Sequence, residues 1–210
     1  MEKEVISDSV IRRLPRYYRY LSELEYRGIE RTSSAVLSEK LGLTASQIRQ
    51  DLNCFGGFGH QGYGYNVAGL KKQLAKILGL DKCNPLIIVG AGHLGGAIAE
   101  GISFSSYGFY LVGIFDISPE ICGTVLGGLT VQSMSGLPEF CNTIKPKTAV
   151  LCIPKESAQA VAEQLVDLGI CGFWNFSHCD LDVDRSVIQV ENVHLGDSLM
   201  TLSYKLHKDE

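Results

Sequence analysis

The sequence predicts an α/β protein with a helical N-terminal part and a Rossmann-type body built on a parallel sheet. Three observations support this fold class. Apolar residues recur at helical spacing through much of residues 1–80, the pattern changes near residues 81–85, and short apolar runs then alternate with helical patterns. Such alternation is typical of a parallel sheet covered by helices. We therefore expect a domain boundary between Asn84 and Pro85.

The composition favours a globular protein. Hydrophobic residues make up 45% of the 210 residues and charged residues 20%, and no run of about 18 apolar residues predicts a membrane span. The charged start leads into no apolar segment, so we expect no signal peptide. The seven cysteines form neither a C-x-x-C pair nor a zinc-finger spacing with histidine, which predicts no metal site. Their odd number without a secretion signal favours reduced thiols and a cytoplasmic protein.

The charge is distributed unevenly along the chain. Residues 1–84 carry 13 Lys and Arg against 9 Asp and Glu, whereas residues 85–210 carry 6 against 14. A basic head on an acidic body predicts that only the head meets a polyanion. Two ordinary solvated surfaces would give the same totals, so charge alone does not decide between these interpretations.

The N-terminal part shows three helical patterns. The first runs through residues 10–24, where Pro15 marks either a kink or a first turn. The second follows a run of good N-cap residues at 32–34 and ends at Gly42. The third begins at Thr44, which has capping-box spacing to Gln47. The tight glycine turn between the second and third helices predicts a helix-turn-helix.

The third helix has two different faces. Its apolar residues fall at i, i+4 and i+7, and its polar residues fall on another face with short hydroxyl, amide and guanidinium groups, which can bond base edges and phosphates. A plain solvated face is the alternative. The apolar face comprises Ile48, Leu52 and Phe55, and the polar face comprises Ser46, Arg49, Gln50 and Asn53.

A glycine-rich segment follows, with five glycines interleaved with aromatics at residues 56–65. It predicts a hairpin wing whose tip, His60 or Gln61, is placed to reach a phosphate or the minor groove, although a plain loop with an aromatic cluster fits the same residues. The first helix also carries Arg12, Arg13, Arg16 and Arg19. Together these features predict binding to double-stranded DNA. The expected contacts are Arg12, Arg16, Ser46, Gln47, Arg49, Gln50, Asn53, Gly59, His60 and Tyr63. A helix over residues 67–78 then links head to body.

The body opens with a dinucleotide-binding pattern. An apolar strand at residues 85–89 enters a G-x-G-x-x-G at residues 90–95, and a helical pattern follows. In that context Gly90 allows a tight turn, Gly92 lets a pyrophosphate approach backbone N–H groups, and Gly95 lets helix pack on strand. The phosphates would then lie at the positive end of the helix.

Asp116 ends the second predicted strand, at residues 109–115. It lies 21 residues after Gly95, close to the spacing of about 20 at which a carboxylate accepts the ribose hydroxyls. A carboxylate there repels a 2′-phosphate and no arginine follows, so we expect NADH and NAD+ rather than the NADP forms. A turn residue that caps the next segment is the alternative.

Further strands are expected at residues 148–153, 172–176 and 187–190, with a helix at residues 157–168. Pro154 directly follows its strand and belongs to the ligand-binding edge of the sheet. The expected nucleotide contacts are Gly90, Ala91, Gly92, His93, Leu94, Gly95, Asp116 and Pro154. A C-terminal helix carries a leucine stripe that packs on its own sheet or on another subunit, and pattern alone slightly favours the former.

An oxidoreductase and a ligand-gated regulator both use a nucleotide domain. Residues 85–190 supply little beyond one Rossmann unit, and His93, His178 and His194 have no paired carboxylate motif. His93 also lies within the phosphate loop, a poor place for hydride chemistry. The DNA-binding head therefore favours a transcription factor that is not an enzyme and that binds NADH without turning it over.

The residues resemble the redox-sensing transcriptional repressor Rex family almost from end to end. The resemblance rests on residues 12–21, 49–52, 58–65 and 90–95, and on Phe115-Asp116. It implies a winged-helix domain at 1–84, a Rossmann NAD(H)-binding domain at 85–191 and a dimerisation helix at 192–210 that is exchanged within a homodimer. It replaces the preference for packing within one chain. It also implies a repressor that holds a palindromic operator when NADH is scarce and releases it when NADH binds.

Several positions depart from the family pattern. A lysine after the recognition arginine is Gln50 here, a tyrosine in the helix after the glycine loop is Gly101, and an aspartate at the start of the exchanged helix is His194. In well-known members the latter two form a hydrogen-bond switch with an arginine that matches Arg19. We expect Arg19 to keep that role, with Asp197 as the acidic partner and Tyr107 as a further candidate. The remaining departures are Asn53-Cys54 and residues 175–178.

Overall fold

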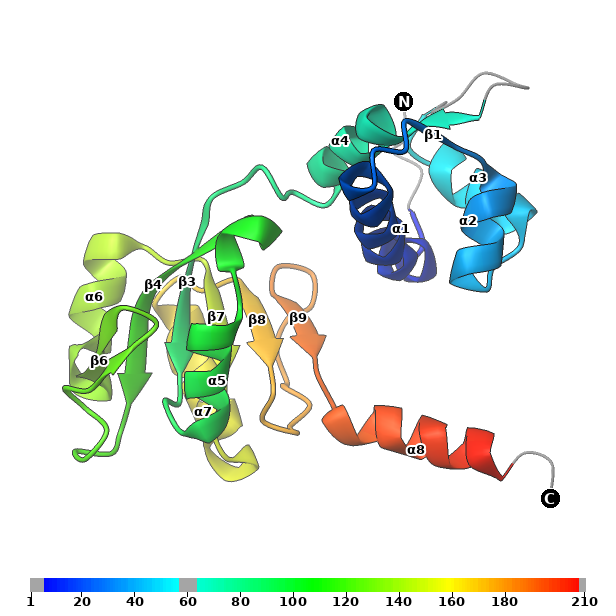
Figure 1. Cartoon of the computed structure of the whole chain (residues 1–210). Coiled ribbons are helices and arrows are strands. Elements are labelled where there is room, and N and C mark those ends of the chain that lie inside the picture. The colour runs from blue at the N-terminus through cyan, green and yellow to red at the C-terminus, as the bar shows by residue number, and fades with distance from the viewer. Residues whose placement is uncertain (1–5, 57–63, 208–210) are drawn as a thin grey trace. The chain divides into compact units, whose positions relative to one another are not determined.

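The computed structural model describes residues 6–56 and 64–207, and it divides into two compact units between Asp81 and Lys82 (Figure 1). Within the described residues, no helix is both long and apolar enough to cross a membrane.

The first unit is mostly helical. Its elements are α1 (Asp8–Tyr26), β1 (Arg31–Thr32), α2 (Ser34–Leu41), α3 (Ala45–Asn53), β2 (Tyr65–Asn66) and α4 (Val67–Ile77). One apolar core joins the four helices, with Leu21, Leu37, Ile48 and Leu74 fully buried. Pro15 lies inside α1 rather than in its first turn.

The expected helix-turn-helix forms, with the expected caps. Ser33 caps α2 by accepting a hydrogen bond from the Val36 N–H, and Gly42 ends this helix in a left-handed conformation at φ 65°. Thr44 caps α3 by accepting from the Gln47 N–H at 3.1 Å. A capping box also needs the Gln47 side chain to bond the Thr44 N–H. That part of the prediction is wrong, because the Gln47 side chain bonds Asp51 instead.

The two short strands of this unit pair with each other, with Thr32 opposite Tyr65. The residue pattern predicted a hairpin within residues 56–65, but β2 pairs with β1, which was not predicted. Gly64 lies so close to β1 that a Cβ on it would stand 2.4 Å from the Thr32 carbonyl oxygen. The expected wing tip lies outside the described residues.

The second unit contains a seven-stranded sheet. Its strands are β3 (Asn84–Val89), β4 (Phe109–Asp116), β5 (Val125–Leu126), β6 (Leu129–Ser133), β7 (Thr148–Leu151), β8 (Gly172–Asn175) and β9 (Gln189–Asn192). They lie in the order β5-β6-β4-β3-β7-β8-β9, and only the β5–β6 pair is antiparallel. The six parallel strands, numbered along the chain, therefore follow the order 3-2-1-4-5-6 of dinucleotide-binding Rossmann folds. The predicted fold class is confirmed.

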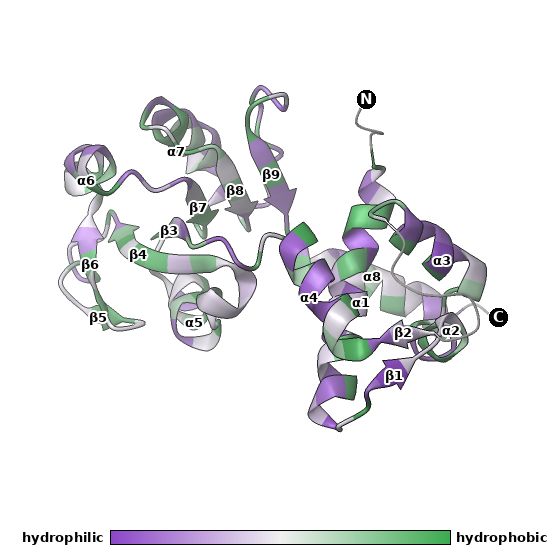
Figure 2. Ribbon diagram, turned by 90° about the horizontal axis from the view of Figure 1, so that it is seen from above, coloured by the Kyte–Doolittle hydropathy of each residue, from purple (hydrophilic) through white to green (hydrophobic). Residues whose placement is uncertain are grey.

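Helices cover both faces of this sheet. They are α5 (His93–Gly101), α6 (Leu137–Ile144) and α7 (Lys155–Asp167), with 3-10 turns η1 (Phe104–Tyr107) and η2 (Met134–Gly136). Side chains of β3 alternate between two cores: Ile87 and Val89 face the core with α6 and α7, whereas Leu86 and Ile88 face the core with α5. Strand β4 also lies between the two cores, and most of its hydropathy colouring in Figure 2 is green or pale.

The last helix, α8 (Leu195–Leu206), follows β9 and has no buried residue. The leucine periodicity slightly favoured packing of α8 on its own sheet. That prediction is wrong, because α8 does not pack on the sheet of its own chain. The last strand, β9, begins and ends two residues later than the predicted 187–190, and β5, β6 and α6 were not predicted.

Candidate functional site

Helix α3 presents the expected polar face to solvent. Ser46, Arg49, Gln50 and Asn53 are all exposed, while Ile48 and Leu52 are buried on the opposite face. The Arg49 guanidinium donates a hydrogen bond from Nη1 to the Ser34 Oγ of α2 at 3.2 Å. These four side chains therefore share one accessible surface, as the spacing predicted.

A buried carboxylate on the same helix organises the opposite side. Asp51 is 1% exposed and accepts two hydrogen bonds from Arg13, Nε to Oδ2 at 2.6 Å and Nη2 to Oδ1 at 2.8 Å. It also accepts from the Tyr17 hydroxyl at 2.5 Å and from Gln47 Nε2 at 2.9 Å. Sequence reasoning grouped Arg13 with the surface arginines of α1, which is wrong because Arg13 bonds Asp51.

The network shifts the pKa of its members. Burial acts to raise the pKa of Asp51, but the hydrogen bonds from Arg13, Tyr17 and Gln47 outweigh burial and hold that pKa below its usual value. Burial, followed by the hydrogen bond to Asp51, raises the pKa of Tyr17. Asp51 is thus an ionised, fully hydrogen-bonded group between α1 and α3.

The other expected DNA contacts of the first unit are on α1 or outside the described residues. Arg12, Arg16 and Arg19 are exposed, and Arg16 donates from Nη2 to the Leu41 carbonyl oxygen at the end of α2, at 2.5 Å. Gly59, His60 and Tyr63 lie outside the described residues.

The glycine loop in the second unit has the expected close approaches. Gly90 has φ 95°, and a Cβ on it would lie 2.3 Å from the Cys152 carbonyl oxygen. A Cβ on Gly95 would lie 1.9 Å from the Gly90 carbonyl oxygen, so only glycine lets α5 pack there. Gly92 differs, because a Cβ on it would meet nothing within 4 Å. It begins α5 without a side-chain cap, which leaves the start of the helix open to an anion.

Asp116 lies at the end of β4 beside this loop. Its Oδ2 accepts from the Ala91 N–H at 2.6 Å and its Oδ1 accepts from the Ser118 N–H at 2.8 Å. The turn-capping alternative from the sequence is therefore part of its role. A carboxylate has about four acceptor positions, so each oxygen keeps capacity for a further hydroxyl.

A cavity of about 250 Å³ lies at this edge of the sheet and brings together four of the expected nucleotide contacts: Gly90, Gly92, Asp116 and Pro154. Ala91, His93, Leu94 and Gly95 do not line it. Sequence reasoning missed the remaining lining residues, which are Val89, Ile117, Met134, Cys152, Ile153, Ser157 and Val161. Val89, Ile117 and Ile153 directly adjoin predicted contacts. Met134 follows β6, a strand that was not predicted.

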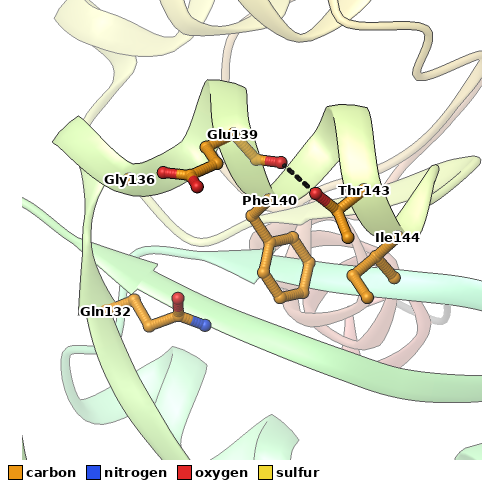
Figure 3. A pocket seen from close by; sticks show the side chains of 6 residues that line it. All are labelled: Gln132, Gly136, Glu139, Phe140, Thr143 and Ile144. Carbon is orange, nitrogen blue, oxygen red and sulfur yellow. Dashed lines mark hydrogen bonds between the residues drawn. The ribbon is translucent and has the colours of Figure 1, made fainter.

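Cys152 lines the cavity, but its thiol is not activated. Burial raises the pKa of its thiol to about 12. A second hollow, of about 300 Å³, lies beside α6 and contains none of the expected site residues (Figure 3). Its lining includes Thr143, whose hydroxyl donates to the Glu139 carbonyl oxygen at 2.9 Å. The cavity at the glycine loop is therefore the candidate nucleotide site.

Two family models match the chain. One, described as a putative DNA-binding protein N-terminus, matches residues 5–53, and the other, a CoA binding domain, matches residues 81–179. The redox-sensing transcriptional repressor Rex of Thermoanaerobacter sp. (strain X514) is 54% identical over 209 residues, 100% of this chain and 93% of the relative. The chain belongs to the Rex family. The Rex protein of Clostridium perfringens (strain SM101 / Type A) is 49% identical over 100% of this chain and 98% of its own length.

Solved structures of RSP, a Rex-family repressor, share the whole fold. The crystal structure of RSP in complex with β-NAD+ and operator DNA matches with a TM-score of 0.91 and 52% identity, over 98% of this chain and 94% of that chain. The structure of RSP in complex with β-NADH matches with a TM-score of 0.91 and 50% identity, over 98% and 96% of the two chains.

The positions that depart from the Rex pattern are placed as follows. Gly101 ends α5, and Tyr107 is 59% exposed in η1. His194 immediately precedes α8, with its Nδ1 3.4 Å from Nδ1 of His178. Asp197 is exposed in the first turn of α8. Arg19 belongs to the first unit, and the other five residues belong to the second.

Proposed function

We propose that this chain is a DNA-binding transcriptional repressor that senses the NADH/NAD+ ratio, and that NADH binding releases it from operator DNA. The observation that carries the proposal is the match over 98% of the chain to RSP, which has been crystallised with β-NAD+ and operator DNA and separately with β-NADH. A repressor that reads chromosomal DNA and the NAD(H) pool acts in the cytoplasm.

The glycine-loop cavity is the proposed site for NADH and NAD+. The residues fit a dinucleotide, because Gly92 has open space where a phosphate would approach the uncapped start of α5. Asp116 would accept the ribose hydroxyls, and Pro154 would line the same cavity. Ala91, His93, Leu94 and Gly95 would contribute their backbone and the packing of the loop.

The proposed DNA-reading surface is the exposed face of α3, with Ser46, Arg49, Gln50 and Asn53 toward base edges. An arginine fork is suited to the two acceptors of a guanine, and an amide is suited to adenine. Arg12 and Arg16 of α1 are proposed phosphate contacts, which would set the orientation of the head without reading sequence.

We also propose a homodimer in which α8 is exchanged between subunits. Leu195, Leu199, Leu202 and Leu206 are between 52% and 71% exposed in the single chain. Four exposed leucines on one helix form an apolar face that a second copy of the chain would cover. A two-fold dimer would present two heads to a palindromic operator. Arg19 and Asp197 are the proposed switch residues.

A dehydrogenase is the alternative for a nucleotide-binding body. The Rex relatives are named as transcriptional repressors, and the described residues that line the cavity include no histidine or lysine to move a proton. The purified protein should therefore bind NADH without oxidising it.

The deciding experiment is a gel shift on a palindromic operator duplex with added NAD+ or NADH. The proposal predicts that the protein retards the duplex with NAD+ and releases it with NADH. Equal retardation in both nucleotides would contradict redox sensing, and no preference for operator over unrelated duplex would contradict the regulator as a whole.

A further inference from the structure

The buried Asp51 network connects the two helices that matter most for DNA binding. Asp51 lies on α3, two residues after Arg49, whereas Arg13 and Tyr17 lie on α1. The carboxylate receives four hydrogen bonds from three side chains, with donor–acceptor distances between 2.5 and 2.9 Å.

The buried charge of Asp51 fixes the relative orientation of α1 and α3. A buried carboxylate is stable only if its partners keep their geometry, because leaving it unpaired costs far more than the pair gains. The arginine fork matches the carboxylate in one orientation only. Any rotation of α3 against α1 would break that match.

Two further hydrogen bonds also hold the helices of this unit in place. Arg16 of α1 donates to the Leu41 carbonyl oxygen at the end of α2, and Arg49 of α3 donates to Ser34 at the start of α2. These two contacts are exposed and therefore weaker. The Asp51 network is the buried member of the set.

We propose that Asp51 is the positioning residue of the α3 reading face: through Arg13 and Tyr17 it sets the angle at which Ser46, Arg49, Gln50 and Asn53 meet a base edge. The proposal rests on the proposed function, since it assumes that α3 reads operator DNA. It assigns Arg13 to this network rather than to phosphates.

The same network defines a role for Gln47, which the sequence predicts as a DNA contact. Its amide nitrogen donates to Asp51 Oδ1, and the side chain is only partly exposed. A bidentate amide contact to adenine needs both the nitrogen and the oxygen of the amide. Gln47 therefore acts on DNA through Asp51.

The test compares operator and unrelated duplex affinities at one salt concentration in full-length Asp51→Asn. Asparagine keeps the shape but turns a donor toward Arg13, so α3 loses its fixed angle. Operator affinity should fall about 10-fold or more, as when one bidentate base contact is lost, while affinity for unrelated duplex stays within about twofold. Glu23→Gln is the charge-matched control: it neutralises another carboxylate of α1, one that pairs with Arg27 on the same helix and makes no contact with Asp51, and it should leave both affinities unchanged.

A purely structural role would change both affinities in proportion to the folded fraction, so the ratio of the two affinities is the decisive readout. An unchanged ratio in folded Asp51→Asn would overturn the proposal and leave the proposed function intact. Failure of the wild type to prefer operator would instead defeat the proposed function. If Asp51→Asn does not fold, Tyr17→Phe removes one of the four hydrogen bonds and is held to the same criterion.

A double-mutant cycle tests Gln47. Gln47→Ala should lower operator affinity in the wild type and have an effect below about twofold in Asp51→Asn, because the two residues act as one unit. Equal effects in both backgrounds would mean that Gln47 reads DNA independently of Asp51, and would overturn its assignment.

Discussion

The Gly92→Ala substitution separates nucleotide binding from folding. Gly92 has φ −67° and ψ −165°, which alanine adopts, and its added Cβ would meet nothing within 4 Å. The loss of glycine at a helix N-cap and the gain from a less flexible unfolded chain are each within about 1 kcal/mol and opposite in sign. The free energy of unfolding should therefore barely change.

The cost of the methyl group should appear on binding. The methyl occupies the space through which a pyrophosphate would approach the N–H groups at the start of α5. Losing one hydrogen bond to a charged group costs about 1.5–3 kcal/mol, which predicts about 10- to 100-fold weaker NADH binding. A fluorescence titration with NADH, together with a thermal unfolding curve, measures both quantities.

Two other glycines provide the controls. Gly136→Ala also adds a Cβ with nothing within 4 Å, outside the proposed site, and should leave NADH affinity unchanged. Gly95→Ala places a Cβ 1.9 Å from the Gly90 carbonyl oxygen and should destabilise the body itself. Wild-type NADH affinity in folded Gly92→Ala would refute the assignment of the phosphate site.

Three further perturbations test the remaining assignments. Arg49→Ala should weaken operator binding by about 1–3 kcal/mol if Arg49 reads a guanine, whereas Ser34→Ala, which removes the hydrogen bond between Arg49 and Ser34 but keeps the guanidinium, should not. Equal losses in a gel-shift titration would assign Arg49 to packing. Asp116→Asn should weaken NADH binding and reduce the difference between the NADH and NADPH affinities, because the charge that repels a 2′-phosphate is gone. A wild-type protein that binds both dinucleotides equally would contradict this role of Asp116. Deleting residues 192–210 should abolish dimerisation and tight operator binding together, and light scattering that still reports a dimer would contradict the role of α8.

Local signals in the sequence predicted much of the fold. The caps at Ser33 and Thr44 and the turn at Gly42 fall where short-range hydrogen-bond chemistry places them. The glycine loop forms between strand and helix as its spacing requires. The β5–β6 hairpin also has a local signal, because the Gly127-Gly128 pair between two short strands is typical of a two-residue hairpin turn.

The rest of the site depends on contacts between distant residues. Arg13 and Asp51 are 38 positions apart, and nothing near either residue in the sequence indicates that Arg13 bonds a buried carboxylate. Met134 reaches the cavity only because β6 lies beside β4. The leucine stripe of α8 has the same periodicity whether it covers its own sheet or another subunit, so periodicity could not decide between them.

If nucleotide binding and operator binding are coupled, each ligand must change the affinity of the protein for the other. NADH lowers operator affinity only if it has different affinities for two arrangements of the protein. Saturating operator duplex must then weaken NADH binding by the same factor, typically about 5- to 150-fold. The measurement is a fluorescence titration of NADH with and without saturating operator duplex. We expect a clear loss of NADH affinity in the presence of operator. An unchanged NADH affinity alongside confirmed operator binding would show that the two sites are independent.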